Sequence, residues 1–495
     1  MMKSHRCFAR RLLQKAVLVV VVVCWCLFVF NVALSQSAPT TEPLRISISN
    51  PRYFTDRGGK AIYLTGSHTW NNRQDFDTTV FDYMAYLNFL VGHNHNFIRL
   101  YVWEEAKGLQ DSNVRPGSRI NPTIYARTGP GRAKDGSLKF NVNQFNEEFF
   151  NRLRSRVIAA GNRGIYVSIM LFNGWSIEKK GKSVDPWNGH PFNQANNANN
   201  VNGDPNKNGN GEATHTLQLP AIRALHEAYV RKVIDTVSDL DNVLYEVSNE
   251  TSGTSAATDW EYYIINYVKQ YEATKPKQHP IGMTVQWPDG NNTNLYHSPA
   301  DWISPNPAAA LPYDYKTNPP PANGSKVVIS DTDHLWGIGG DRVWAWKSFL
   351  RGLNIIYMDT YLGDYINIQA NESLRENMGY ILTYARKMNL MKMISQSNLC
   401  STGYCLANTG ATDAEYLVYV PSGGRATVNL TATTGQLCVD WFNPSKGAIA
   451  SQGITTGGAN RLFVAPFRGD AVLHIYSQSD TISPMRSPNP ERIPR

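Results

Sequence analysis

A glutamate stands at the end of an apolar, strand-like run in the middle of the chain. Residues 243–250 read Val-Leu-Tyr-Glu-Val-Ser-Asn-Glu, so the run closes with Asn249 and Glu250. A carboxyl group at the end of a buried strand is well placed to give a proton to a leaving oxygen and to take one from water. The neighbouring amide of Asn249 is suited to hydrogen-bond a hydroxyl group. We therefore predict that Glu250 is a general acid/base and expect a second carboxylate close to it.

Two aspartates are candidates for that second carboxylate. The apolar run Val327–Ser330 leads directly into Asp331, and Asp333 follows two residues later beside His334. Asp331 is favoured because it continues the strand, and Asp333 is the alternative because the two-residue period of a strand gives it the same facing. Two carboxyl groups are what hydrolysis of a glycosidic bond requires: one protonates the leaving oxygen, and the other attacks the anomeric carbon or activates water.

A single charge interrupts another strand-like run. Arg99 lies inside the otherwise apolar segment Phe97–Val102, where a buried charge is costly unless a carboxylate pairs with it. Arg99 is therefore expected to pair with a carboxylate, either at a reactive site or in a purely structural ion pair. An earlier run, Ala61–Gly66, leads into His68 and Trp70. These two side chains either line a sugar-binding site or fill the core.

Aromatic residues gather at or just past the ends of such runs. They are Trp70, Trp103, Trp175, Trp187, Trp287, Trp336 and Tyr361. Sugar rings present apolar C–H faces that pack on side chains of this kind. Any single one is explained as a core residue, but seven at corresponding positions favour a carbohydrate-binding surface.

The connection between residues 172 and 215 is longer than ordinary barrel loops, and long loops are usually functional. It contains Asp204, Asn206 and Asn208 at the spacing that begins a calcium loop, but position twelve is His215 instead of Glu. We therefore predict no metal site and no cofactor.

The elements that must position these residues alternate between buried strands and helical spacing. The predicted strands are Ala61–Gly66, Phe97–Val102, Ile165–Leu171, Val243–Val247, Ile281–Val285, Trp302–Ser304, Val327–Ser330 and Ile355–Met358. This alternation is typical of β/α units around a parallel sheet, and eight such units are enough to close a barrel. The predicted fold class is α/β, with a (β/α)8 TIM barrel at residues 38–391. Active sites of such barrels form at the carboxyl ends of the strands.

The pattern changes beyond residue 391. Glycine-rich turns separate short alternating strands at Tyr416–Val420, Ala426–Leu430, Leu437–Trp441 and Ala471–Tyr476. They predict a small all-β sandwich domain at residues 392–479. Residues 480–495 contain four prolines and few apolar side chains, so we expect a disordered tail there.

Residues 1–37 have the composition of a secretory leader. Basic residues without an acid precede the unbroken apolar run 16–30, and a small-residue exit at 33–35 follows, as in a signal peptide. We predict a secreted protein, extracellular or periplasmic, with a retained N-terminal membrane anchor as the alternative. The rest of the chain has no basic run or stripe, so neither nucleic acid nor, once the leader is cleaved, a membrane is expected as a partner. In an oxidising compartment Cys400 and Cys405 are candidates for a disulfide.

The strand that ends in Asn249-Glu250 resembles the fourth strand of the cellulase-like clan A glycoside hydrolases. The resemblance implies that Glu250 is the acid/base, that Asn249 contacts the 2-hydroxyl of the sugar, and that Arg99 steadies the nucleophile. That clan has a Glu nucleophile after its seventh strand, where this chain has Asp331. A retaining mechanism is favoured, but an inverting one stays open, because Asp is one methylene shorter and its use would widen the gap between the two carboxyl groups.

The opening segments Pro51–Asp56 and Tyr63–His68 are similar to cellulase-like proteins that end in a collagen-binding-type domain. Glu415–Val420 and Trp441–Pro444 resemble that module. The prediction is thus a glycosidase acting on a poly- or oligosaccharide, and the alternative is an inactive barrel that binds carbohydrate or matrix. Substrate contacts are expected from Asn249, Arg99, His68, Trp70, Trp103, His334 and Trp336. The sugar, the linkage and the oligomeric state stay open.

Overall fold

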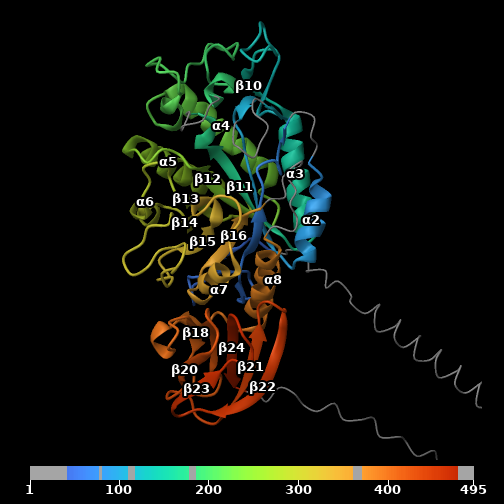
Figure 1. Ribbon diagram of the computed structural model, residues 1–495. Helices are drawn as coiled ribbons and strands as arrows, with labels where there is room; N and C mark the ends of the chain where they lie inside the picture. The colour runs from blue at the N-terminus through green and yellow to red at the C-terminus, as the bar shows by residue number, and fades with distance from the viewer. Residues whose placement is uncertain (1–41, 77–80, 110–117, 178–184, 360–370, 478–495) are drawn as a thin grey trace, which may run out of the picture.

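The computed structural model describes residues 42–76, 81–109, 118–177, 185–359 and 371–477 (Figure 1). The predicted leader, the tail at 480–495 and Tyr361 lie outside these residues. Within the described ranges, none of the helices is both long enough and apolar enough to cross a lipid bilayer.

Eight parallel strands close a barrel, as the alternation of strands and helices predicted (Figure 1). They are β4 (Thr65–His68), β6 (Phe97–Leu100), β11 (Tyr166–Asn173), β12 (Val243–Asn249), β13 (Ile281–Thr284), β14 (Trp302–Ser304), β15 (Val327–Asp331) and β16 (Asn354–Met358). Every residue of these strands is buried. Near-continuous apolar runs are expected where helices cover one face of a parallel sheet and side chains fill the other.

The first predicted strand is two elements in the structure. Ala61–Ile62 forms β3, which pairs antiparallel with β2 (Phe54–Thr55), and β1 (Arg45–Ile46) completes a three-stranded sheet. The barrel strand β4 begins only at Thr65. The predicted boundaries were wrong because apolar residues continue across the point where the chain leaves the small sheet for the barrel.

Helices surround the barrel (Figure 1). They are α2 (Tyr83–Gly92), α3 (Glu147–Gly161), α4 (Pro220–Val237), α5 (Ser255–Glu272), α6 (Asn292–His297), α7 (Arg342–Leu350) and α8 (Glu372–Lys387). Capping residues set their starts: the side chain of Asn146 accepts a backbone N–H at the start of α3, and Thr254 does the same for α5. The short α6 lies in a stretch rich in Pro and Asn.

Two small antiparallel sheets of short strands are separate from the barrel. They are a three-stranded sheet of β5 (Asp75–Phe76), β8 (Ser118–Asn121) and β7 (Lys107–Leu109), and a two-stranded sheet of β9 (Tyr125–Ala126) and β10 (Asn141–Phe145).

The C-terminal domain is all β, as predicted (Figure 1, orange to red). Its strands are β17 (Ile394–Ser395), β18 (Cys405–Asn408), β19 (Glu415–Val420), β20 (Arg425–Asn429), β21 (Gln436–Asn443), β22 (Ala448–Thr456), β23 (Asn460–Val464) and β24 (Ala471–Ser477), arranged in a six-stranded and a two-stranded sheet. The domain packs on α7, where Trp346 stacks on Tyr419 at 6.2 Å between ring centroids. Cys400 and Cys405 are free thiols, so the expected disulfide is not formed.

Candidate active site

A cavity of about 710 Å³ opens at the carboxyl ends of the barrel strands. The strands that flank it end in register, since Asn173 at the end of β11 pairs with Asn249 at the end of β12. The lining includes Glu250, which directly follows β12, and Asp333, which follows β15. The cavity therefore occupies the part of the barrel where active sites of this fold form.

Glu250 and Asp333 approach each other in this cavity. A carboxylate oxygen of Glu250, one of Asp333 and a ring nitrogen of His334 all lie within 4.8 Å of one another. Glu250 has a backbone φ of 46°, a conformation that is uncommon for residues other than Gly, Asn and Asp and that often marks a functional site. Gly174 packs so closely on it that an added Cβ would lie 2.3 Å from the Glu250 carbonyl oxygen.

Asp331, the favoured second carboxylate, lies one layer deeper. It is the last residue of β15, has no exposed surface and is not among the residues that line the cavity. Arg99 Nη1 lies 2.6 Å from Asp331 Oδ2, and His68 Nε2 lies 3.1 Å from Asp331 Oδ1. Arg99 Nε also donates to Glu246 Oε2 at 2.7 Å. We call His68, Arg99, Glu246 and Asp331 the charged floor.

The two aspartates have opposite electrostatic environments. Burial alone would raise the pKa of Asp331, but Arg99 and His68 outweigh it and hold that pKa well below its usual range. At Asp333, burial and the charges of Glu250 and Asp331 raise the pKa well above its usual value, and Arg99 opposes them only in part from 3.9 Å. Asp331 is therefore an anion at neutral pH, whereas the environment of Asp333 favours its protonated form.

A short turn decides which aspartate faces the cavity. Asp331 Oδ1 accepts the backbone N–H of Asp333 at 3.0 Å and so begins a 3-10 turn over Thr332–His334. The strand therefore ends at Asp331, and its two-residue alternation does not reach Asp333. The turn, instead of the strand, aims Asp333 at the cavity.

Asn249 and His334 form a hydrogen-bonded rim. His334 Nε2 donates to Asn249 Oδ1 at 3.2 Å, and Asn249 Nδ2 donates to the Tyr101 hydroxyl at 2.6 Å. The Ser304 hydroxyl donates to His334 Nδ1 at 3.0 Å, and burial lowers the pKa of His334 to about 3, so the ring is neutral. His334 lines the cavity, whereas Asn249, like Arg99 and His68, is buried beneath the lining.

Five of the seven predicted aromatic residues line the cavity: Trp70, Trp103, Trp175, Trp287 and Trp336. Trp175 and Trp287 stack with ring centroids 5.6 Å apart and planes 11° from parallel. Trp175 also donates its indole N–H to Glu250 Oε2. Trp187 is instead buried in the long connection, where it stacks on His190.

Three residues of this region were not predicted from the sequence. Tyr101 follows Arg99 by two positions, so the period of the strand carried a signal for it. Glu246 is a lone acid in an apolar run, just as Arg99 is a lone base, and that match was a second signal. Lys316 lines the cavity with its ammonium group 5.2 Å from the Trp336 ring centroid, and it comes from an irregular segment whose sequence gives no such signal.

The closed β/α barrel and the β domain that follows it define the class of fold. Solved structures share this architecture. A glycoside hydrolase of family 5 from Bacteroides vulgatus superposes with a TM-score of 0.60 at 14% identity, over 90% of this chain and 95% of that chain. A second structure, described as a glycoside hydrolase, has a TM-score of 0.56 at 12% identity, over 90% and 99% of the two chains. At these identities the likeness establishes the fold, barrel and β domain together.

Two family models match parts of the sequence. Residues 113–288 match one described as "Domain of unknown function (DUF6298)", and residues 391–474 match one described as "Putative collagen-binding domain of a collagenase". The second match confirms the predicted resemblance of the C-terminal domain to that module. A search of curated proteins finds no match.

Proposed function

We propose that the protein is a glycoside hydrolase with Glu250 and Asp333 as its two catalytic carboxyl groups. The observation that carries the proposal is the approach of their carboxylate oxygens to within 4.8 Å, in a cavity lined by indole rings. Glycosidic hydrolysis needs two carboxyl groups on either side of a sugar, and aromatic faces bind sugar rings. The two structural neighbours, both described as glycoside hydrolases, support the same reaction.

The short separation favours retention of anomeric configuration. Carboxyl groups about 5 to 5.5 Å apart belong to retaining enzymes, whereas inverting enzymes need about 6.5 to 9.5 Å to admit a water molecule. In the first step Asp333 forms a bond to the anomeric carbon, the glycosidic C–O bond breaks, and the proton of Glu250 goes to the leaving oxygen. In the second step water attacks the anomeric carbon, Glu250 takes the proton of that water, and the ester bond to Asp333 breaks.

Asp333 is assigned this role in preference to Asp331 for two reasons. Asp333 lines the cavity and Asp331 does not. Asp331 is also already paired with Arg99 and His68, so an attack by its oxygen would break a buried ion pair. The guanidinium of Arg99, 3.9 Å from Asp333, stabilises the anionic form that Asp333 must take to attack the anomeric carbon.

The test is release of reducing sugar by the purified protein from a panel of plant and microbial polysaccharides, beside Glu250→Ala. We expect activity on at least one polysaccharide, its loss in the variant, and proton NMR showing that the first product keeps the anomeric configuration of the substrate. A wild type that releases no reducing sugar would favour the inactive, carbohydrate-binding alternative. So would a wild type that binds polysaccharide without turnover and binds it equally well as Glu250→Gln.

Azide rescue assigns the two roles. The substrate is an aryl glycoside of the released sugar with an activated leaving group. Azide is expected to give a glycosyl azide of retained configuration with Glu250→Ala, because it attacks the glycosyl-enzyme. With Asp333→Ala it is expected to give the inverted azide, because it attacks the substrate directly. Exchanged outcomes would reverse the two roles.

We also propose that the protein acts outside the cytoplasm, because residues 1–37 have the pattern of a signal peptide. N-terminal sequencing of the exported protein is expected to show a new terminus close to residue 36. An intact leader on a membrane-bound protein would support the anchored alternative.

A further inference from the structure

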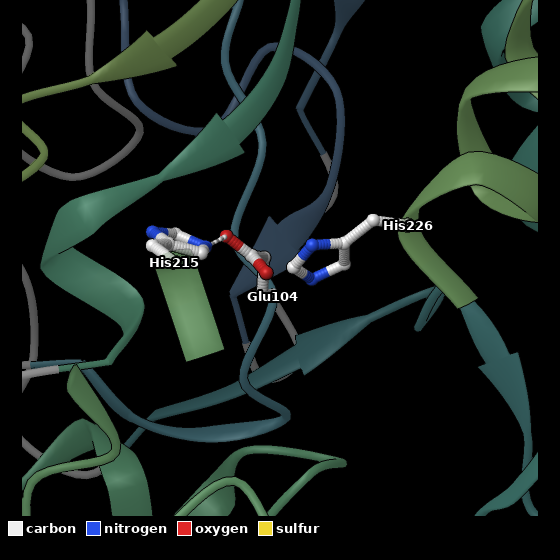
Figure 2. Close-up of side chains that lie close together, drawn as sticks. All are labelled: Glu104, His215 and His226. Carbon is white, nitrogen blue, oxygen red and sulfur yellow. Dashed lines mark ion pairs between the residues drawn. The ribbon is translucent and has the colours of Figure 1, made fainter. Parts of the chain in front are cut away.

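A second buried cluster lies beside the barrel mouth. Glu104 follows β6, His190 and His215 lie in the connection between β11 and α4, and His226 lies on α4. None of the four is more than 5% exposed. His215 Nε2 lies 3.2 Å from Glu104 Oε1, and His190 Nε2 lies 3.4 Å from Glu104 Oε2. Figure 2 shows Glu104 between His215 and His226.

One glutamate and three histidines suggest a metal site, but their hydrogen bonds argue against it. His226 Nδ1 accepts the indole N–H of Trp260 at 3.2 Å. His190 Nδ1 accepts the backbone N–H of Phe192 at 3.1 Å. A neutral imidazole whose Nδ1 faces a donor carries its proton on Nε2, whereas a metal-bound imidazole needs a bare Nε2 and donates its other N–H. Both rings therefore carry their proton on Nε2 and offer no bare Nε2 to a metal, and His190 directs that N–H to Glu104 Oε2 at 3.4 Å.

The protonation states of the side chains in this cluster agree with the absence of a metal. Burial lowers the pKa of His226 to about 3 and lowers the pKa of His190, so both rings are neutral. Burial alone would raise the pKa of Glu104, but His215 and His190 outweigh it and hold that pKa well below its usual range. Glu104 is thus a buried anion at neutral pH, held by N–H donors.

The same carboxylate is connected to the proposed acid/base. Glu104 Oε1 accepts the backbone N–H of Asn173 at 2.8 Å, and the Glu104 backbone N–H donates to the Ser176 hydroxyl at 3.0 Å. The side-chain oxygen of Asn173 accepts the backbone N–H of Trp175 at 3.1 Å. Trp175 then donates its indole N–H to Glu250. An unbroken series of contacts therefore runs from Glu104 to Glu250.

We propose that Glu104 is a positioning residue that acts on Glu250 through Trp175. Its side chain holds the long connection at its start, middle and end, through Asn173, His190 and His215. This fixes the turn after β11, so that the indole N–H stays on the Glu250 carboxylate. A donated N–H favours the ionised carboxylate, which is the form that takes a proton from water in the second step. The inference rests on the proposed function of Glu250.

The test compares Glu104→Gln with Glu272→Gln as a matched control. Glu272 is also a buried carboxylate paired with a buried histidine, His279, at 2.7 Å, but it is the last residue of α5 and does not line the cavity. Both variants are expected to lose stability. Only Glu104→Gln is expected to lower kcat by about 10- to 100-fold, with a smaller change in KM and a shift of the pH–rate profile to higher pH.

A double-mutant cycle with Trp175→Phe tests whether Glu104 acts through Trp175. If it does, the losses of kcat in the two single variants do not add, because either change removes the same contact to Glu250. Asn173→Ala cuts the same series of contacts and is expected to reproduce the fall in kcat and the shift in pH, also where Glu104→Gln does not fold.

Three results would overturn the proposal: kinetics of Glu104→Gln that match Glu272→Gln, additive losses in the cycle, or stoichiometric zinc that copurifies with the wild type and is lost in Glu104→Gln. If the wild type is active, Glu250→Ala is inactive and Glu104→Gln keeps full kcat, then the role of Glu104 is wrong while the proposed function stands. An inactive wild type would instead end the proposed function.

Discussion

Asp331 in the charged floor and Asp333 on the cavity surface stand two residues apart, yet their carboxyl groups are in opposite states. Arg99 and His68 hold the pKa of Asp331 low, whereas burial and Glu250 raise the pKa of Asp333. A carboxylate enclosed by cationic and N–H groups serves to stabilise the fold and stays ionised, because its protonation would leave those groups without a charged partner. A carboxyl group beside another carboxylate is able to change its protonation state, and that freedom is what catalysis uses.

The largest expected effect is on turnover, from Asp333→Asn. The change removes the proposed nucleophile but keeps the size of the side chain, so kcat is expected to fall by roughly 1000-fold or more. The melting temperature should stay within a few degrees of that of the wild type, because burial and Glu250 already disfavour a charge on Asp333 and the amide is neutral. Steady-state kinetics and differential scanning calorimetry measure the two quantities. Turnover close to that of the wild type would remove Asp333 from the mechanism.

The same substitution at Asp331 is expected to act on stability. Asp331→Asn leaves Arg99 with Glu246 as its one carboxylate partner within 3 Å in the described floor, and breaking a buried ion pair costs about 3 to 5 kcal/mol. Urea unfolding followed by circular dichroism should show this loss at pH 7, with Asp333→Asn as the control. A loss below about 1 kcal/mol would mean that the floor does not stabilise the barrel as we infer.

The pH dependence of that loss sharpens the comparison. The pKa of Asp331 is lower in the folded protein than its usual value of about 3.9. Its contribution to stability is therefore fully present above about pH 4 and is lost as the pH falls toward the folded value. The difference in unfolding free energy between wild type and Asp331→Asn should thus narrow below about pH 4. Urea unfolding at pH 7, 5 and 3.5 measures it, and a constant difference would contradict the low folded pKa.

The smallest expected effect is on substrate affinity, from Trp336→Ala. Trp336 lines the cavity and is only partly buried, so its loss removes a face for a sugar ring but little of the core. KM should rise by about tenfold, in line with roughly 1 to 1.5 kcal/mol for an aromatic contact. Trp336→Phe keeps an aromatic face and should retain most of the affinity. Equal KM values for both variants and the wild type would place the substrate elsewhere in the cavity.

The barrel and the position of Glu250 could be predicted from sequence because most of the barrel strands are largely apolar runs. The choice between Asp331 and Asp333 could not. Both fit the two-residue alternation, and what separates them is the turn Thr332–His334, which Asp331 itself begins by capping the N–H of Asp333. A capping contact inside a short polar stretch leaves no periodic signal.

The other features that could not be predicted depend on contacts between residues far apart in the sequence. Glu104 meets His190 and His215 only because the connection between β11 and α4 folds back on the barrel, and these residues are more than 80 positions apart in sequence. Lys316 reaches the cavity from an irregular segment between β14 and β15. Local sequence patterns therefore predict neither the contacts of Glu104 with the two histidines nor the position of Lys316 at the cavity.

Trapping of the covalent intermediate tests the central claim most directly. The protein is incubated with a 2-deoxy-2-fluoro glycosyl fluoride of the sugar that it releases, because the fluorine at carbon 2 slows hydrolysis of the glycosyl-enzyme. The labelled peptide is then sequenced by mass spectrometry. The account predicts one fluorosugar on Asp333. A label on Asp331, or inversion of configuration by an active enzyme that is never labelled, would contradict it.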